Sequence, residues 1–143
     1  MNTFVARCGM KRITVLLADD HPVVREGLRA LLEREDDIAV IGEAHNGREA
    51  VQMTKKLMPA VVVMDIAMPL LNGVEATRQI LEAIPSARIV ILSANGDEEY
   101  VEKLIGLGAV GYLVKHTSAL ALSKAIRKAN AGKTFFGPAI SKR

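Results

Sequence analysis

Four charged residues in this chain directly end or follow apolar runs: Asp19, Asp20, Asp65 and Lys115. The runs are Ile13–Ala18, Val61–Met64 and Val110–Val114. If these runs are neighbouring parallel strands, the three carboxylates and the ammonium group meet at one edge of the sheet. Buried carboxylates are costly unless a cation binds them, and hard cations such as Mg²⁺ prefer oxygen ligands. The pattern therefore predicts a cation site at the carboxyl ends of these strands.

Phosphoryl transfer is a chemistry that such a site can perform. Aspartate can act as a nucleophile that forms an aspartyl phosphate, and the transfer depends mainly on positioning and charge neutralisation. Asp20 and Asp65 can bind Mg²⁺ directly, with Mn²⁺ as the alternative ion, and Asp19 can hold a metal-bound water. The backbone carbonyl of Ala67 can complete the ligands from the protein. Lys115 supplies a cation for the phosphoryl oxygens.

Two further polar residues lie beside this group. Ser93 ends the apolar run Ile89–Leu92 and can donate a hydrogen bond at the same edge. His21 follows the two acids, but Mg²⁺ prefers oxygen ligands, so we expect His21 to take part in a helix start rather than in metal binding.

Strand-like and helix-like patterns alternate along the chain. Continuous apolar runs are typical of strands that are covered on both faces, and apolar residues at helical spacing separate them. The expected strands are Ile13–Ala18, Ile38–Gly42, Val61–Met64, Ile89–Leu92 and Val110–Val114. The first expected helix begins at Pro22. The other expected helices span Arg48–Met58, Val74–Ile84, Asp97–Leu107 and Ser118–Ala131. In the fourth helix, Val101, Leu104 and Ile105 are expected to face the core.

This succession predicts an α/β domain with a flavodoxin-like (βα)5 doubly wound parallel sheet. Right-handed crossovers place helices on both faces, and the expected strand order is 2-1-3-4-5. In that order the first and third strands flank the point where the winding reverses, which is where such sheets bind ligands. Asp19, Asp20 and Asp65 end those two strands, so the topology and the carboxylates indicate the same site.

The composition agrees with one soluble domain, because 50% of the 143 residues are hydrophobic and 24% are charged. Aromatic residues make up only 3%, which argues against a surface for stacking bases. The net charge is +3, and the basic residues near the C-terminus are interpreted as a solvated face rather than a nucleic-acid contact. The single cysteine, Cys8, fits a reducing cytoplasm, and no apolar stretch is long enough to span a membrane.

The domain is expected to cover residues 13–131. Residues 1–12 form an N-terminal extension that lacks the apolar segment of a secretory signal. Residues 132–143 contain Gly, Pro and basic residues, and they are expected to start a linker to a second domain that this chain lacks.

Four segments resemble the receiver domain of bacterial two-component response regulators: Ala18–Pro22, Met64–Pro69, Leu92–Ala94 and Gly111–Lys115. The run from Asp19 to Leu28, with the sequence DDHPVVREGL, is similar to the NarL/FixJ subgroup with LuxR-type output. The resemblance implies phosphoryl acceptance from a sensor histidine kinase. The roles it implies are phosphoacceptor for Asp65, metal binding for Asp19 and Asp20, phosphate sensing for Lys115, and switching for Ser93 and Tyr112.

The same resemblance implies how the signal leaves the domain. A receiver of this subgroup is a cytoplasmic protein that assists its own phosphorylation and dephosphorylation but is not a turnover enzyme. Phosphorylation promotes a homodimer, either through the last helices or through the first helix, Pro22–Glu33. The output is transcription regulation through a DNA-binding helix-turn-helix domain, here the absent C-terminal domain.

Two residues depart from the pattern of the family. His116 replaces the proline that commonly follows the lysine, so a trans Lys115–His116 bond is expected. Leu70 stands where many relatives have Gly, and a loop that needs a positive φ there would strain Leu.

Three alternatives compete with this interpretation. A flavodoxin-like electron carrier needs a phosphate loop without acids after the first strand, but Asp19 and Asp20 stand there. A haloacid-dehalogenase-type hydrolase needs an acid two residues after its nucleophile, where this chain has Ala67. The third alternative is a stand-alone or phosphorylation-independent receiver that acts as a docking module.

Overall fold

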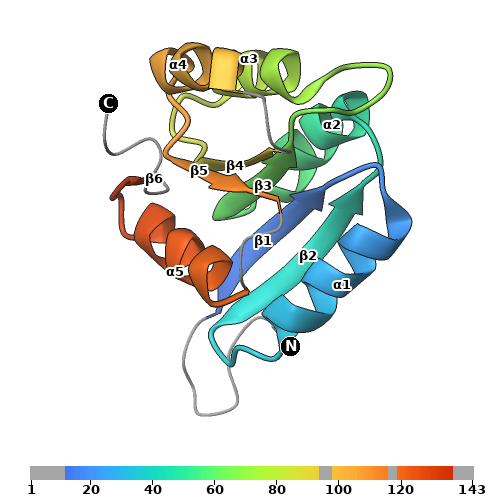
Figure 1. The fold of residues 1–143 in the computed structure, drawn as a ribbon, viewed down its shortest axis with the longest axis vertical. Coiled ribbons are helices and arrows are strands. Elements are labelled where there is room, and N and C mark those ends of the chain that lie inside the picture. Colours follow the sequence, from blue (N-terminus) through green and yellow to red (C-terminus); the bar gives the residue numbers. More distant parts are fainter. Residues whose placement is uncertain (1–11, 94–97, 116–118, 137–143) are drawn as a thin grey trace.

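The computed structural model describes residues 12–93, 98–115 and 119–136, and within them it contains one six-stranded parallel sheet (Figure 1). The strand order is β2-β1-β3-β4-β5-β6, so the order predicted for the first five strands is confirmed. The strands are β1 (Ile13–Ala18), β2 (Ile38–Ala44), β3 (Val61–Asp65), β4 (Ile89–Ser93), β5 (Gly111–Val114) and β6 (Phe135–Phe136).

Helices cover both faces of the sheet, with α1 and α5 on one face and α2, α3 and α4 on the other (Figure 1). They are α1 (Pro22–Glu33), α2 (Gly47–Leu57), α3 (Gly73–Ala83), α4 (Glu98–Leu107) and α5 (Ala119–Asn130). None of the helices in these ranges is long and apolar enough to cross a membrane.

The continuous apolar runs supply two cores because successive strand residues point to opposite faces. In β1, Leu16 packs toward α2 and α3, whereas Val15 and Leu17 pack toward α1 and α5. In β3, Val62 and Val63 divide in the same way between the two cores. Burial on both faces therefore explains why these strands show no alternation of polar and apolar residues.

Two Asn-Gly pairs start helices on the face that carries α2 and α3. The Asn46 side chain accepts a hydrogen bond from Glu49 N at 2.8 Å, and Asn72 accepts one from Glu75 N at 2.9 Å. Such capping satisfies an amide that the first turn of a helix leaves without a partner. The second cap places the start of α3 directly behind the end of β3.

A sixth strand was not predicted, and it occupies part of the region 132–143 that the sequence suggested as a linker. Gly132, with φ +81°, ends α5 in a Schellman motif: Lys133 N donates to Lys128 O at 2.8 Å and Gly132 N to Ala129 O at 3.0 Å. The turn directs Phe135–Phe136 along β5, and the two phenylalanines pack against opposite cores.

One predicted core position in α4 is wrong. Val101 and Leu104 are fully buried as expected, but Ile105 is 38% exposed. Ile105 lies four residues after Val101, on the same side of the helix, but at the edge of the buried stripe, where solvent still reaches it.

Candidate functional site

Four neighbouring strands bring the predicted site residues to one edge of the sheet. Asp65 is the last residue of β3, and Ser93 is the last residue of β4. Asp19 and Lys115 directly follow β1 and β5. Ala18 pairs with Met64 across β1 and β3, so Asp19 and Asp65 come next on adjacent strands. The parallel register therefore gathers residues that lie far apart in the sequence.

Lys115 bridges the acidic residues. Its Nζ lies 3.0 Å from Asp65 Oδ2 and 3.2 Å from Asp19 Oδ2. The backbone holds the lysine at this edge, because Lys115 N donates to Ser93 O at 2.6 Å. Asp19, Asp65 and Ser93 are buried. The Lys115 ammonium group therefore lies between these buried residues and the solvent.

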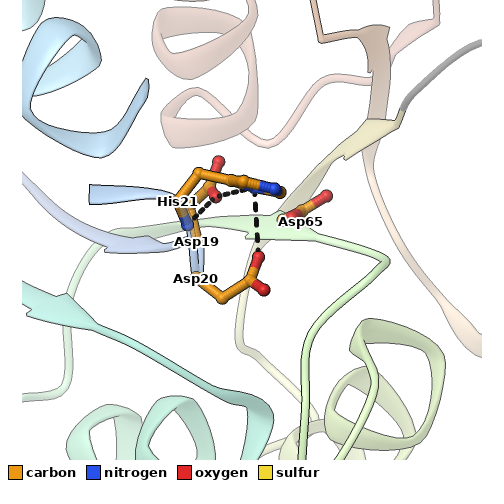
Figure 2. A group of neighbouring side chains, drawn as sticks. All are labelled: Asp19, Asp20, His21 and Asp65. Atoms are coloured by element: carbon orange, nitrogen blue, oxygen red, sulfur yellow. Dashed lines mark hydrogen bonds and ion pairs between the residues drawn. The ribbon is translucent and has the colours of Figure 1, made fainter. Parts of the chain in front are cut away.

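His21 stands at the start of α1 as expected, in the N-cap position. Its backbone N–H donates to Asp19 Oδ1 at 2.8 Å, which fixes the turn between β1 and the helix. The exposed ring also lies among the acids, since Nδ1 is 3.2 Å from both Asp19 Oδ1 and Asp20 Oδ1 (Figure 2). The sequence predicted the place of His21 in the helix start but not this position of its ring.

Burial and charge act in opposite directions on Asp65. Burial raises the pKa of the Asp65 carboxyl; the hydrogen bond from Lys115 opposes this rise, and the nearby Asp19 adds to it, so the net pKa is raised. Burial alone would lower the pKa of Lys115, but its bonds to Asp65 and Asp19 outweigh burial and raise it. The lysine is therefore held as an ammonium ion.

The donor set fits a hard divalent cation. Asp19, Asp20, His21 and Asp65 each offer a ligand atom, and these atoms lie within 4.8 Å of one another (Figure 2). Within the described part of the chain, Asp19 Oδ2 and Asp20 Oδ1 are buried and accept no hydrogen bond. Each of these oxygens lies 3.2 Å from one nitrogen, Lys115 Nζ or His21 Nδ1, and Mg²⁺ or Mn²⁺ would satisfy the lone pairs that remain.

Ala67 is exposed in the loop after β3, and its backbone N–H donates to the Asp65 carboxylate. The loop continues through Leu70, whose φ is +66° and which is 71% exposed. Leu70 thus adopts a positive φ, which is uncommon for a residue other than Gly, with its side chain in solvent.

Ser93 and Tyr112, the predicted switch pair, come from the adjacent strands β4 and β5. Both are buried. Tyr112 belongs to the core beneath α4, together with Val101 and Leu104. Ser93 pairs with Val114 in the β4–β5 ladder, two residues beyond Tyr112, and the switching role of Ser93 and Tyr112 stays a prediction.

Arg25 is the residue of this site that the sequence did not single out. Its guanidinium is buried, with Nη1 donating to the backbone oxygen of Asp19 at 2.7 Å and Nε donating to Glu43 Oε1 at 2.8 Å. Arg25 and Glu43 lie 18 positions apart on different elements, so no local spacing could have paired them.

The Lys115–His116 bond, which was expected to be trans, lies outside the described residues. The end of the motif Leu92–Ala94 and the N-terminal extension 1–11 also lie outside them.

Comparison with known proteins agrees with this geometry. The family model described as response regulator receiver domain matches residues 15–127. The uncharacterised transcriptional regulatory protein YxjL of Bacillus subtilis is 44% identical over 125 residues, which are 87% of this chain and 57% of that protein. The nitrate/nitrite response regulator protein NarL of Escherichia coli is 38% identical over 128 residues, which are 90% of this chain and 59% of that protein. The chain thus spans less than two thirds of the length of these relatives.

Solved structures give the same result. A LuxR-family two-component response regulator from Aurantimonas has a TM-score of 0.87 at 36% identity, covering 92% of this chain and 94% of that one. The receiver domain of RcsB from Salmonella enterica, solved in the presence of a beryllofluoride phosphomimetic, has a TM-score of 0.82 at 27% identity, covering 92% and 98%. The chain therefore belongs to the response regulator receiver domain family, and its relatives are NarL- and LuxR-type transcriptional regulators.

Proposed function

We propose that Asp65 accepts a phosphoryl group from a sensor histidine kinase and that the domain relays this event by changing conformation. One observation carries the proposal: the buried Asp65 carboxylate lies 3.0 Å from the Lys115 ammonium, beside two buried carboxylate oxygens that accept no hydrogen bond from the described residues. A nucleophile, a cation and the acids for a metal thus share one sheet edge.

The residues divide the work of the transfer. An Asp65 carboxylate oxygen bonds to phosphorus while the phosphorus–nitrogen bond of the kinase phosphohistidine breaks, and the electron pair stays on the imidazole nitrogen. Lys115 neutralises charge on the phosphoryl oxygens, and the Ser93 hydroxyl donates to one of them. Asp20, Asp65 and the Ala67 carbonyl would hold Mg²⁺, with Asp19 holding one of its waters. A bound Mg²⁺ supplies further positive charge to the phosphoryl oxygens.

The proposal extends to partners and output. We infer a cytoplasmic receiver that dimerises when phosphorylated and controls a DNA-binding domain that follows residues 132–143. The relatives YxjL and LiaR support the transcriptional output, because they are named as transcriptional regulatory proteins and are longer than this chain. The domain assists its own phosphorylation and dephosphorylation without acting as a turnover enzyme.

Modification of Asp65 tests the proposal. Acetyl phosphate should add one phosphoryl group to the wild type only when Mg²⁺ is present, and intact-mass spectrometry measures the addition. Asp65→Ala should abolish it because the nucleophile is lost. The matched control is Asp36→Ala, which removes an exposed aspartate away from the sheet edge and should leave the modification unchanged. An undiminished adduct in Asp65→Ala would place the nucleophile elsewhere.

The metal arm of the same experiment uses Asp20→Asn. Removing one carboxylate charge should weaken Mg²⁺ binding and raise the Mg²⁺ concentration needed for modification, whereas Asp36→Asn should change neither. Equal Mg²⁺ affinity in the wild type and Asp20→Asn, measured by titration calorimetry, contradicts the metal assignment.

A further inference from the structure

The backbone of Asp19 is held from two sides by the end of β2. Its N–H donates to the backbone oxygen of Ala44 at 3.0 Å, continuing the β1–β2 ladder by one residue. Its C=O accepts from Arg25 Nη1 at 2.7 Å. Both polar groups of this residue are therefore occupied, immediately before the peptide bond that leads to Asp20.

Arg25 is itself fixed by Glu43, the neighbour of Ala44 on β2. Arg25 Nε donates to Glu43 Oε1 at 2.8 Å, and the Arg25 side chain is only 9% exposed. A guanidinium donates along two separate directions from one rigid plane, whereas an ammonium group is a single point of charge. The Arg25 guanidinium thus connects the backbone of Asp19 to the side chain of Glu43.

Burying a guanidinium is costly unless each of its contacts is satisfied. Arg25 is not needed to pack α1 against the sheet, because Leu28 and Leu32 of this helix supply the apolar contacts. The buried charge instead faces the turn that carries two of the three acids.

We propose that Arg25 is a positioning residue for the acidic pair Asp19–Asp20, with Glu43 holding its guanidinium in place. By binding the Asp19 carbonyl, Arg25 sets the orientation of the peptide group between the two acids and hence the directions of both carboxylates. The inference rests on the proposed metal-assisted function of these acids, and it assigns their geometry to a side chain that touches neither the metal nor the phosphoryl group.

Arg29 provides a matched control within the same helix. Its Nη1 also donates to Glu43, at Oε2, but within the described residues no hydrogen bond or ion pair joins Arg29 to Asp19, and the Arg29 side chain is 41% exposed. Arg25→Met and Arg29→Met therefore each remove one positive charge from α1. Each also breaks an ion pair with the Glu43 carboxylate. Only the first removes the bond to Asp19.

The first measurement follows Mg²⁺ binding by amide NMR. Arg25→Met should weaken Mg²⁺ affinity by about 10- to 100-fold, the usual loss when a residue that orients metal ligands is removed. Arg29→Met should stay within about twofold of the wild type, because the Asp19 carbonyl keeps its partner. Arg25→Lys should remain weaker than the wild type, since an ammonium group cannot bond Asp19 and Glu43 in the same geometry. Equal affinity in Arg25→Met and Arg29→Met overturns the proposal, and so does full recovery in Arg25→Lys.

The second measurement is made without metal. Arg25→Met should shift the Asp19 and Asp20 amide resonances and speed exchange of the Asp19 amide, whereas Arg29→Met should not. If Arg25→Met fails to fold, the double variant Arg25→Met/Glu43→Gln, in which no Glu43 carboxylate is left unpaired, takes its place. Its control is Glu43→Gln alone, because that variant keeps the guanidinium that binds Asp19 O. If the wild type binds no Mg²⁺ while these shifts occur, the proposed function fails and the positioning role stands. If Mg²⁺ binds and the shifts are equal in both variants, the positioning role fails alone.

Discussion

Gly73 limits where the main chain of Asp65 can lie. A Cβ built on Gly73 would be 2.2 Å from Asp65 O and 2.8 Å from Ile66 Cα, and backbone atoms cannot move aside as a flexible side chain can. Gly73 N also donates to Ile66 O at 2.7 Å, which closes the loop that carries Ala67. The end of β3 and the start of α3 are therefore in direct backbone contact.

We expect Gly73→Ala to destabilise the domain by about 1–3 kcal/mol, the usual cost of forcing an extra carbon into a packed site. The added carbon should also displace Asp65, so modification by acetyl phosphate should slow more than the loss of folded protein explains. Urea unfolding and the initial rate of phosphoryl addition measure the two effects.

Gly27→Ala is the matched control for this substitution. Gly27 lies within α1, and a Cβ there meets nothing within 4 Å. Alanine should therefore stabilise the helix by about 0.5–1 kcal/mol. Equal stabilities for the Gly73→Ala and Gly27→Ala proteins would show that the loop behind Asp65 can move freely.

At the scale of elements, Arg127 joins α5 to the turn that precedes β2. Its guanidinium binds Asp37 through Nε at 2.8 Å and Nη2 at 2.9 Å, and it reaches Glu35 through Nη2 at 2.6 Å. The hydrogen bond from Arg127 is the main cause that lowers the pKa of the Asp37 carboxyl, although burial opposes it. The network closes the face of the sheet that α1 and α5 share.

Arg127→Gln should lower the free energy of unfolding by about 1 kcal/mol at pH 7, the upper value for a partly exposed ion pair. A carboxyl whose folded pKa is lowered contributes stability above its unfolded pKa of about 3.9, and this contribution is lost as the pH falls through the lower, folded pKa. The difference between wild type and variant should therefore be constant from about pH 7 to 5 and shrink below about pH 4.

Urea unfolding across this pH range measures the difference. Lys124→Gln, which removes an exposed charge from the same helix, should show little loss at any of these pH values. A difference that grows as the pH falls would contradict the assigned sign.

At the scale of the whole molecule, the proposed switch must alter a surface that a second copy can recognise. Two helices on opposite faces of the sheet offer apolar side chains of nearly equal exposure: Leu31 of α1, at 40%, and Ile105 of α4, at 38%. The α1 face also carries Val23, the most exposed of the large apolar side chains in the described residues. We therefore favour α1 as the face that self-associates.

Beryllofluoride with Mg²⁺ should promote a dimer, and sedimentation velocity measures it. Leu31→Asp should prevent the dimer because a charge would be buried without a partner, whereas the matched variant Ile105→Asp should leave it intact. The opposite result would move the interface to α4.

Ser93→Ala should still accept phosphoryl but dimerise less, and a dimer as strong as that of the wild type would contradict the role of Ser93 in the switch.

The sequence by itself determined the layered fold and the place of the acids. Strands covered on both faces must be apolar at every position, so runs such as Val61–Met64 are visible without any alignment. Parallel strands joined by helices place all their carboxyl ends at one edge, and this rule alone predicts that Asp19, Asp65, Ser93 and Lys115 meet there.

Only the tertiary structure decided the contacts that join distant elements without a local pattern. β6 has two residues, too few for any period, and it exists because the Schellman turn at Gly132 directs the chain along β5. The bridge of Lys115 between Asp19 and Asp65, and the hold of Arg25 on Asp19, depend on side chains reaching across the sheet edge. The structure also leaves Ile105 partly exposed, because only a narrow stripe of α4 is buried against the sheet.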